Sequence, residues 1–202
     1  ARVDETRENC DYLPGVPLPE NVRATHALGD CKDADLIVFV TPSTALRDIA
    51  GRVRDAGVRE SGTLVLSCTK GIEHGSGMRM SEVLSEVLPP NPIAVLSGPN
   101  LAVEVVRGLP TATVIGSTNE NYAMELQRFL GSEHFRIYTS DDVVSIELGG
   151  ALKNVFAIAA GVSDGLGLGD NSKAALITRA LAELLRLGKR MGGNERTFYG
   201  LS

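Results

Sequence analysis

Short apolar runs alternate with amphipathic stretches along the first two thirds of the chain. The run 36–40 is apolar at every position, as in a strand covered on both faces of a sheet. Four similar runs predict strands at 63–67, 93–96, 112–115 and 135–138, and the stretches between them predict helices over 44–56, 80–88, 101–107 and 121–130. Strands that alternate with helices imply crossover connections, so we expect an α/β fold with a largely parallel, doubly wound sheet.

The pattern becomes purely helical near Asp141. From there to Gly161 the apolar residues recur at helical spacing, and Asp141 and Asp142 can cap the helix start. A second long helix is expected over 172–191, with Gly192-Gly193 ending it. The change predicts two domains with a boundary near residue 141.

Two segments near the start of the chain carry weaker patterns. Residues 22–24 could add a short strand to the sheet. Residues 13–19 include three prolines and are expected to form a surface loop.

Composition narrows the classes of function. The 202 residues carry a net charge of -5 without basic runs, which argues against nucleic-acid binding. No uninterrupted apolar run reaches the roughly 18 residues needed to cross a bilayer, and the start lacks a signal-peptide pattern. The cysteines are far apart and lack CxxC spacing, which fits reduced thiols in a cytoplasmic protein, and the histidines are isolated, so we expect no metal site: Cys10, Cys31, Cys68, His26, His74 and His134.

Three polar segments directly follow predicted strands: Thr41-Pro42-Ser43, Cys68-Thr69-Lys70-Gly71 and Ser97-Gly98-Pro99-Asn100. In open α/β sheets, ligands bind at the carboxyl ends of the strands. Lys70 could meet a phosphate or carboxamide as a point charge, and Gly98 would let a ligand approach the backbone. The structural alternative is a set of ordinary turns, with Ser43 and Asn100 as helix N-caps and Lys70 solvated.

Lys153 lies inside a predicted helix, on a face of small and apolar residues. Gly149 and Gly150 precede it by four and three residues and so share its face, where they would clear space for a small substrate. Partial desolvation favours the neutral amine and lets such a lysine exchange a proton near neutrality. The alternative is an amphipathic lysine that extends its amine to solvent. The paired glycines and the adjacent Asn154 favour the catalytic interpretation.

The segment Gly165-Leu-Gly-Leu-Gly169 is rich in glycine and in this respect resembles a phosphate-binding loop. A dinucleotide fingerprint, however, follows a strand and opens a helix, whereas a predicted helix precedes this segment. We therefore expect a tight turn between two helices. If the protein binds a dinucleotide, its G-x-G-x-x-G loop precedes residue 1.

Taken in order, these motifs resemble the NAD(P)-dependent glycerol-3-phosphate dehydrogenase family of the bacterial type. The resemblance covers essentially the whole chain, and its segments are 12–19, 69–71, 96–99, 148–155, 161–167 and 174–179. It implies a partial, truncated Rossmann-like dinucleotide-binding domain at residues 1–140 and the start of an all-helical substrate domain at residues 141–202.

The resemblance also implies roles for individual residues. The family interconverts sn-glycerol 3-phosphate and dihydroxyacetone phosphate by hydride transfer with NAD or NADP, which feeds glycerophospholipid synthesis. Lys153 would exchange the proton and polarise the ketone oxygen. The residues implied to contact substrate are Lys70, Gly98, Asn100, Lys153 and Asn154, and those implied to contact the cofactor are Lys70, Pro42 and Ala102. Bacterial members often have Ser or Thr in place of Asn100. Family members are often homodimers.

The family's pyrophosphate loop would precede Ala1 and its main phosphate anchor would follow Ser202. We therefore expect the 202-residue chain to be incomplete and inactive by itself. Two alternatives stay open: a related lysine-dependent hydroxyacid or 6-phosphogluconate-type dehydrogenase, and a non-catalytic truncated scaffold. The segments 96–99 and 148–154 favour glycerol 3-phosphate.

Overall fold

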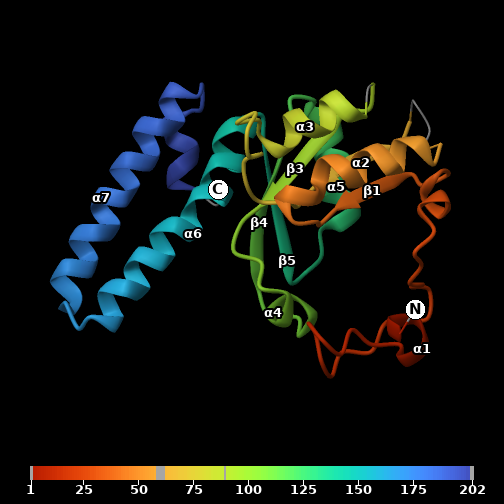
Figure 1. Ribbon diagram of the computed structural model, residues 1–202, viewed down its shortest axis with the longest axis horizontal. Helices are drawn as coiled ribbons and strands as arrows, with labels where there is room; N and C mark the ends of the chain where they lie inside the picture. Colours follow the sequence, from red (N-terminus) through yellow and green to blue (C-terminus); the bar gives the residue numbers. More distant parts are fainter. Residues whose placement is uncertain (1, 58–61, 89, 201–202) are drawn as a thin grey trace.

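The computed structural model describes residues 2–57, 62–88 and 90–200. Its centre is a sheet of five strands in the spatial order β1-β2-β3-β4-β5 (Figure 1). Each predicted strand is present: β1 (Leu36–Phe39), β2 (Leu64–Ser67), β3 (Ile93–Ser97), β4 (Thr111–Gly116) and β5 (Phe135–Ser140). The helices are α1 (Arg2–Thr6), α2 (Leu46–Asp55), α3 (Met80–Val87), α4 (Ala102–Val106), α5 (Glu120–Leu130), α6 (Val143–Gly165) and α7 (Gly169–Arg190), with 3-10 turns η1 (Leu28–Cys31), η2 (Ser43–Ala45) and η3 (Glu195–Tyr199).

The sheet is mixed because one of its four pairings is antiparallel. β1–β2, β2–β3 and β4–β5 are parallel, but β3 and β4 run in opposite directions, with Val95 opposite Gly116. The connection between β3 and β4 holds only the five-residue α4, which is too short to return the chain across the sheet for a parallel pairing. The carboxyl ends of β1, β2 and β3 therefore share one edge, and those of β4 and β5 lie at the other.

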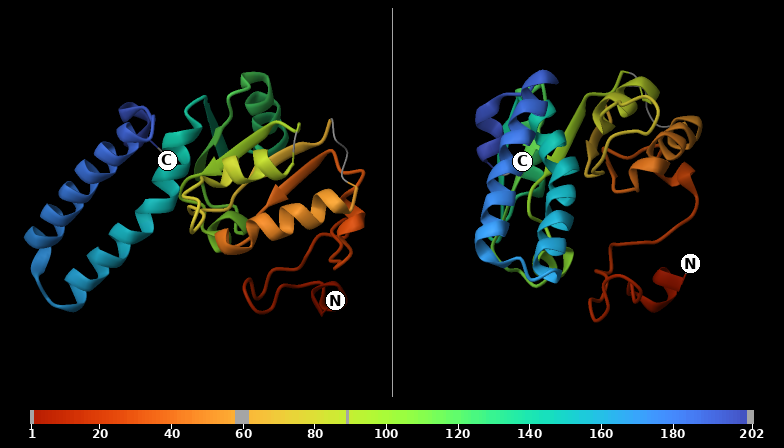
Figure 2. Two further views of the ribbon diagram at one scale, coloured as in Figure 1. Left: turned by 45° about the horizontal axis from the view of Figure 1, so that its top comes forward. Right: turned by 60° about the vertical axis from the view of Figure 1, so that its left-hand side comes forward.

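Helices cover both faces of this sheet, as the alternating pattern predicts. On one face α2 and α3 pack against β1 and β2, with Phe39, Val65 and Leu84 in the core. On the other face α5 packs against β2 to β5 through Tyr122 and Leu126. Figures 1 and 2 show the α6–α7 hairpin at one end of the molecule and the N-terminal segment at the other.

α6 begins at the edge where β5 ends and runs across β3 and β4 toward the opposite edge. Asp142 is its N-cap and accepts a hydrogen bond from the Ser145 amide at 3.1 Å, as expected. Ile146 packs against Val95 on the sheet. The second half of α6 leaves the sheet and pairs with α7 (Figure 2). This diagonal path is what carries Lys153 to the carboxyl edge of β3.

The turn between the two long helices is the glycine-rich segment 165–169. Gly167 has φ +65° and Gly169 φ +80°, so the segment is the predicted helix–helix turn, without a preceding strand. Gly192, just beyond the end of α7, has φ +89° and confirms the expected helix stop.

Two expectations about local structure are wrong, and the two N-caps of the structural alternative are absent. Residues 22–24 form no strand, whereas 13–19 is a loop as predicted. β1 is not covered on both faces within the described residues, since Val38 is 42% exposed. Ser43 is not an N-cap, because Pro42 is the N-cap residue of η2 and Ala45 is the N-cap residue of α2. Asn100 is not one either, since Leu101 precedes α4.

By length and composition alone, α6 could cross a membrane. Its first half, however, packs on the sheet and carries Glu147 and Lys153, which bond to other parts of the chain. Core helices of soluble proteins meet the same criterion, so the observation supports no membrane assignment.

Glycines on the α6–α7 hairpin give a direct test of this packing. A Cβ at Gly188 on α7 would clash with the ring edge of Phe198, which is buried with Leu148 and Leu184, whereas a Cβ at Gly161 on α6 would meet open space. Gly188→Ala should therefore lower the free energy of unfolding by about 1–3 kcal/mol through overpacking. Gly161→Ala should raise it by up to about 1 kcal/mol, because alanine favours the helix. Urea unfolding of both variants checks the pair, and equal effects would contradict the packing.

Candidate active site

Lys70 and Lys153 meet over the carbonyl group of Gly98. Lys70 Nζ donates to the Gly98 oxygen at 3.2 Å, and Lys153 Nζ donates to the same oxygen at 3.4 Å. Lys70 follows β2, Gly98 follows β3 directly, and Lys153 comes from the middle of α6. Three segments that are far apart in the sequence thus converge at the carboxyl edge of the parallel strands, where α/β proteins bind ligands.

The site carries concentrated positive charge. The pKa of Lys70 is lowered from 10.5 to about 8. The largest cause is partial burial, the next are the contact with Lys153 and the charge of Lys153, and nearby Cys68 opposes the shift. Among the described residues no carboxylate pairs with either lysine. Burial raises the pKa of Cys68 to about 11, so its thiol stays protonated. Two unpaired cations at one oxygen fit an anionic ligand, or an oxygen on which negative charge develops.

The orientation of the Gly98 carbonyl depends on glycine. Gly98 has φ +144°, and a Cβ there would lie 2.9 Å from Thr113 Oγ1 and 3.0 Å from Thr113 Cα. Thr113 in turn donates its hydroxyl to the Ser97 oxygen at 2.6 Å, which fixes the neighbouring strand end. A side chain at Gly98 would disturb both the backbone and the oxygen that holds the two amines.

The expectation that Gly150 clears space for substrate is wrong. A Cβ at Gly150 would lie 2.6 Å from Ser97 Oγ and 3.8 Å from Lys70 Cδ, so protein atoms already occupy that side. The missing side chain instead lets α6 approach the end of β3 closely. Gly149 is buried within the same helix.

The loop after β1 adjoins the lysine pair. A Cβ at Gly71, which has φ +143°, would lie 2.8 Å from Ser43 Cβ, and the Thr41 amide donates to Thr69 Oγ1 at 3.2 Å. Pro42 is exposed between them. The loop that carries Pro42 and the segment that carries Lys70 therefore form one continuous rim.

The other predicted residues differ in their placement. Asn100 Oδ1 and Thr41 Oγ1 are buried at the carboxyl edge, without a hydrogen-bond partner among the described residues. Asn154 and Ala102 are exposed, and no hydrogen bond within the described ranges joins either to the lysines. The structure thus brings together Lys70, Gly98 and Lys153 and leaves Asn154 and Ala102 at the surface.

Residues that sequence reasoning did not single out lie beside this site. The carboxylate of Glu147 on α6, whose side chain is 6% exposed, pairs with Arg79 at 2.7 Å and accepts from the Ser81 amide at 2.8 Å. An acidic residue among apolar positions near the helix start could have indicated a buried charge pair. The sequence does not reveal its partner, because Arg79 lies 68 positions away.

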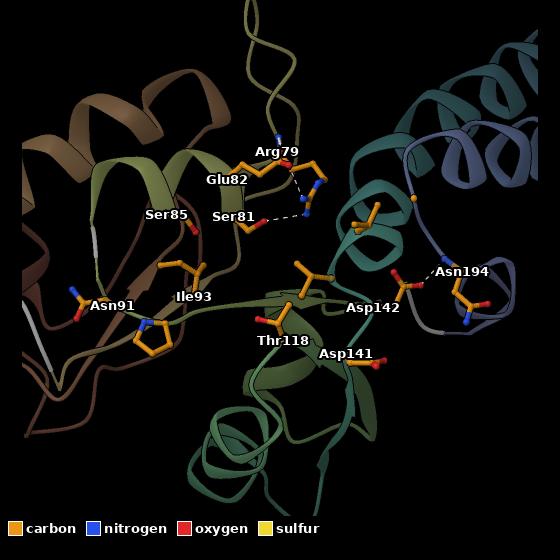
Figure 3. A pocket seen from close by; sticks show the side chains of 14 residues that line it. Arg79, Ser81, Glu82, Ser85, Asn91, Ile93, Thr118, Asp141, Asp142 and Asn194 are labelled. Carbon is orange, nitrogen blue, oxygen red and sulfur yellow. Dashed lines mark hydrogen bonds and ion pairs between the residues drawn. The ribbon is translucent and has the colours of Figure 1, made fainter.

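A large cavity lies between α3 and the start of α6, and its lining extends from Arg79 and Ser81 to Asn91. It has a volume of about 780 Å³, and Figure 3 shows Asn91, Thr118, Asp141 and Asn194 around it. Asp142, which lines this cavity, caps α6 and accepts a hydrogen bond from the backbone N–H of Asn194 at 2.9 Å, so both of its carboxylate oxygens already accept hydrogen bonds. The cavity does not include the lysine pair.

The fold is that of a dinucleotide-binding, Rossmann-like α/β domain followed by a helical region. A family model described as NAD-dependent glycerol-3-phosphate dehydrogenase N-terminus matches residues 1–123, and one described as the C-terminus of the same enzyme matches residues 142–202. The chain therefore belongs to the NAD-dependent glycerol-3-phosphate dehydrogenase family.

Individual relatives agree with this assignment. The chain is 48% identical over 200 residues to Glycerol-3-phosphate dehydrogenase (NAD(P)+) of Desulfitobacterium hafniense and 49% identical over 203 residues to that of Streptomyces coelicolor. These alignments cover 99% of this chain but only 56% and 60% of the relatives. The crystal structure of glycerol-3-phosphate dehydrogenase from Coxiella burnetii superposes with a TM-score of 0.93 at 39% identity, covering 99% of this chain and 61% of that one.

A more distant structure shares the fold alone. The PanE/ApbA family ketopantoate reductase from Ralstonia eutropha has a TM-score of 0.63 at 17% identity, covering 89% of this chain and 59% of that one.

The contact between the two amines can be tested by titration. Lys153→Met removes the neighbouring charge and the contact with its amine, so the pKa of Lys70 should rise from about 8 toward 10.5. It should stay below 10.5, because burial is the largest cause of the shift. NMR of the labelled lysine amines measures the change. Lys189→Met, at the exposed end of α7, is the matched control and should leave Lys70 unchanged. An unmoved Lys70 titration in Lys153→Met would show that the amines do not touch.

Proposed function

We propose that the protein carrying this chain interconverts sn-glycerol 3-phosphate and dihydroxyacetone phosphate with NAD or NADP, and that Lys153 exchanges the proton. Family membership supports the reaction class. The observation that carries the residue assignment is that Lys153 and Lys70 bond the same oxygen of Gly98 at the carboxyl edge of the sheet. The proposed domain boundary lies at residue 141, because the chain passes there from β5 into α6.

The proton chemistry depends on the N–H donors of Lys153 that are not bonded to Gly98. An ammonium group has three N–H donors, and the Gly98 carbonyl occupies one of them. The others can donate to the oxygen of a ketone, polarising it and delivering a proton as the alcohol forms. In the oxidative direction the neutral amine accepts the hydroxyl proton. Lys70, with a pKa of about 8, adds positive charge for the same oxygen or for a phosphate.

The residues present fit a nicotinamide cofactor at the rim beside Lys70. When bound, the nicotinamide ring supplies or accepts the hydride. Pro42, Lys70 and Ala102 are the residues of this chain proposed to contact it. Thr41 Oγ1 is buried next to Pro42 without a partner in the described chain and can bond a carboxamide. These residues would orient the ring and exclude water.

The substrate is proposed to lie between Gly98 and Lys153. Asn100 has a buried Oδ1 without a partner among described residues, so it can accept a bond from a substrate hydroxyl. Asn154 is exposed at the open side of the pair. A cytoplasmic location, which the sparse cysteines favour, and a homodimeric state, which rests on the family resemblance, belong to the same proposal.

Replacing Lys153 tests the function directly. In the protein that carries this chain, Lys153→Met should lower kcat for reduction of dihydroxyacetone phosphate about 10²- to 10⁴-fold, because the proton donor is lost. The consumption of NADH or NADPH measures the rate. Lys189→Met should keep the wild-type rate, since its side chain is exposed at the end of α7.

Two results would contradict the proposal. A near wild-type rate in Lys153→Met would remove Lys153 from the chemistry. A wild-type protein that reduces a 2-keto acid or acts on 6-phosphogluconate, and leaves dihydroxyacetone phosphate unchanged, would favour the related lysine-dependent dehydrogenases.

A further inference from the structure

Glu147 ties the helix of Lys153 to the start of α3. Its carboxylate accepts from Arg79 Nη1 at 2.7 Å, from the Ser81 amide at 2.8 Å and from the Ser81 hydroxyl at 2.5 Å. Arg79 also donates to the Ser81 hydroxyl at 3.2 Å, so the three side chains form a closed network. Figure 3 shows Arg79 and Ser81 turned toward α6.

The same network reaches the segment of Lys70. Arg79 forms an antiparallel bridge with Ile72, which lies two residues after Lys70. Ile72 packs against the cluster that contains Leu148, the residue next to Glu147 on α6. The loop between Ile72 and Arg79 is held by Glu73, which accepts from Arg47 at 2.8 and 2.9 Å. Arg79 is therefore joined to Lys70 through a short, braced hairpin and to Lys153 through Glu147.

Stability alone is a poor reason for this buried ion pair. Taking two charges out of water costs about as much as their attraction returns, and apolar replacements of such pairs are often neutral. What a buried pair with several hydrogen bonds supplies is a defined geometry, because each bond restricts where the carboxylate can lie. Glu147 lies six residues before Lys153 on one rigid helix, so fixing the first fixes the second.

We propose that Glu147 is a positioning residue, whose bonds to Arg79 and Ser81 set how α6 approaches the Lys70 segment and so hold both amines against Gly98. The inference rests on the proposed function for its effect on turnover. It predicts that loss of the network separates the two amines even where the chain stays folded.

The test compares variants that remove the network with one that removes a neighbouring ion pair. Glu147→Gln keeps an acceptor, and the double variant Arg79→Met with Glu147→Met removes both charges and leaves neither unpaired. Glu82→Gln is the matched control, because Glu82 also pairs with Arg79, at 2.7 Å, but lies on α3, and within the described residues no hydrogen bond or ion pair joins it to α6. Thermal unfolding establishes that each variant is folded.

The first readout is the kinetics of ketone reduction in the protein that carries this chain. The double variant should lose about 10- to 100-fold in kcat, with a smaller change in KM, because the proton donor is displaced from its target. Glu147→Gln should retain more activity than the double variant, and Glu82→Gln should match wild type. A folded double variant with wild-type kcat would overturn the proposal. If the double variant unfolds, the kcat values of Glu147→Gln and Glu82→Gln are compared instead. A lower kcat in Glu147→Gln supports the proposal, and equal values overturn it.

The second readout needs no turnover. Competitive acylation of Lys70 near pH 8, followed by mass spectrometry, reports the influence of Lys153 on its amine. Lys70 should become less reactive in the double variant and stay unchanged in Glu82→Gln. Unaltered Lys70 reactivity in the folded network variants would refute the positioning role. Activity that survives Lys153→Met would instead refute the proposed function, while the acylation result would still decide the role of Glu147.

Discussion

The close approach of α6 to the end of β3 determines the geometry of the whole site. Ile146 packs on Val95, Gly150 lies against Ser97, and Lys153 reaches the oxygen of Gly98. These contacts follow one line along the helix and one line along the strand. Because protein interiors are close-packed, a side chain at Gly150 would shift the helix and with it the amine of Lys153.

The reversal between β3 and β4 makes that approach possible. Since β4 and β5 run opposite to β3, β5 ends at the amino edge of β3, and α6 starts there with Asp142 as its cap. The helix then runs toward the carboxyl edge, where the segments after β2 and β3 already lie. Lys70 and Lys153 consequently face each other from different elements. The Gly98 carbonyl offsets part of the repulsion between the two amines. The remaining positive charge favours binding of an anion at this site.

Local pattern was sufficient to locate the five strands, the Asp142 cap and the helix–helix turn at 165–169, because each depends on neighbouring residues. It also indicated that Lys70 and Gly98 lie together, since parallel strands end at one edge. It could not give the direction of β4, which depends on the length of a connection and not on the periodicity of the strand. Ser43 and Asn100, the N-caps of the structural alternative, do not cap these helices, because α2 starts two residues later and α4 one residue later than their patterns suggest.

The sequence alone could not predict contacts between residues that are far apart in the chain. The pairing of Glu147 with Arg79 joins positions 68 apart, and the contact of Gly150 with Ser97 exists only once α6 lies on the sheet. The resemblance to the family supplied chemical roles that periodicity does not contain. The chain spans 56% and 60% of the length of the relatives from Desulfitobacterium hafniense and Streptomyces coelicolor.

Short amine cross-linking tests the central arrangement most directly. Difluorodinitrobenzene joins only amines that can approach each other closely, and the two amines here share one carbonyl oxygen. The folded chain should yield a peptide that links Lys70 to Lys153, and urea or Lys153→Met should abolish it. Single adducts on both lysines, without the linked peptide, would contradict the account.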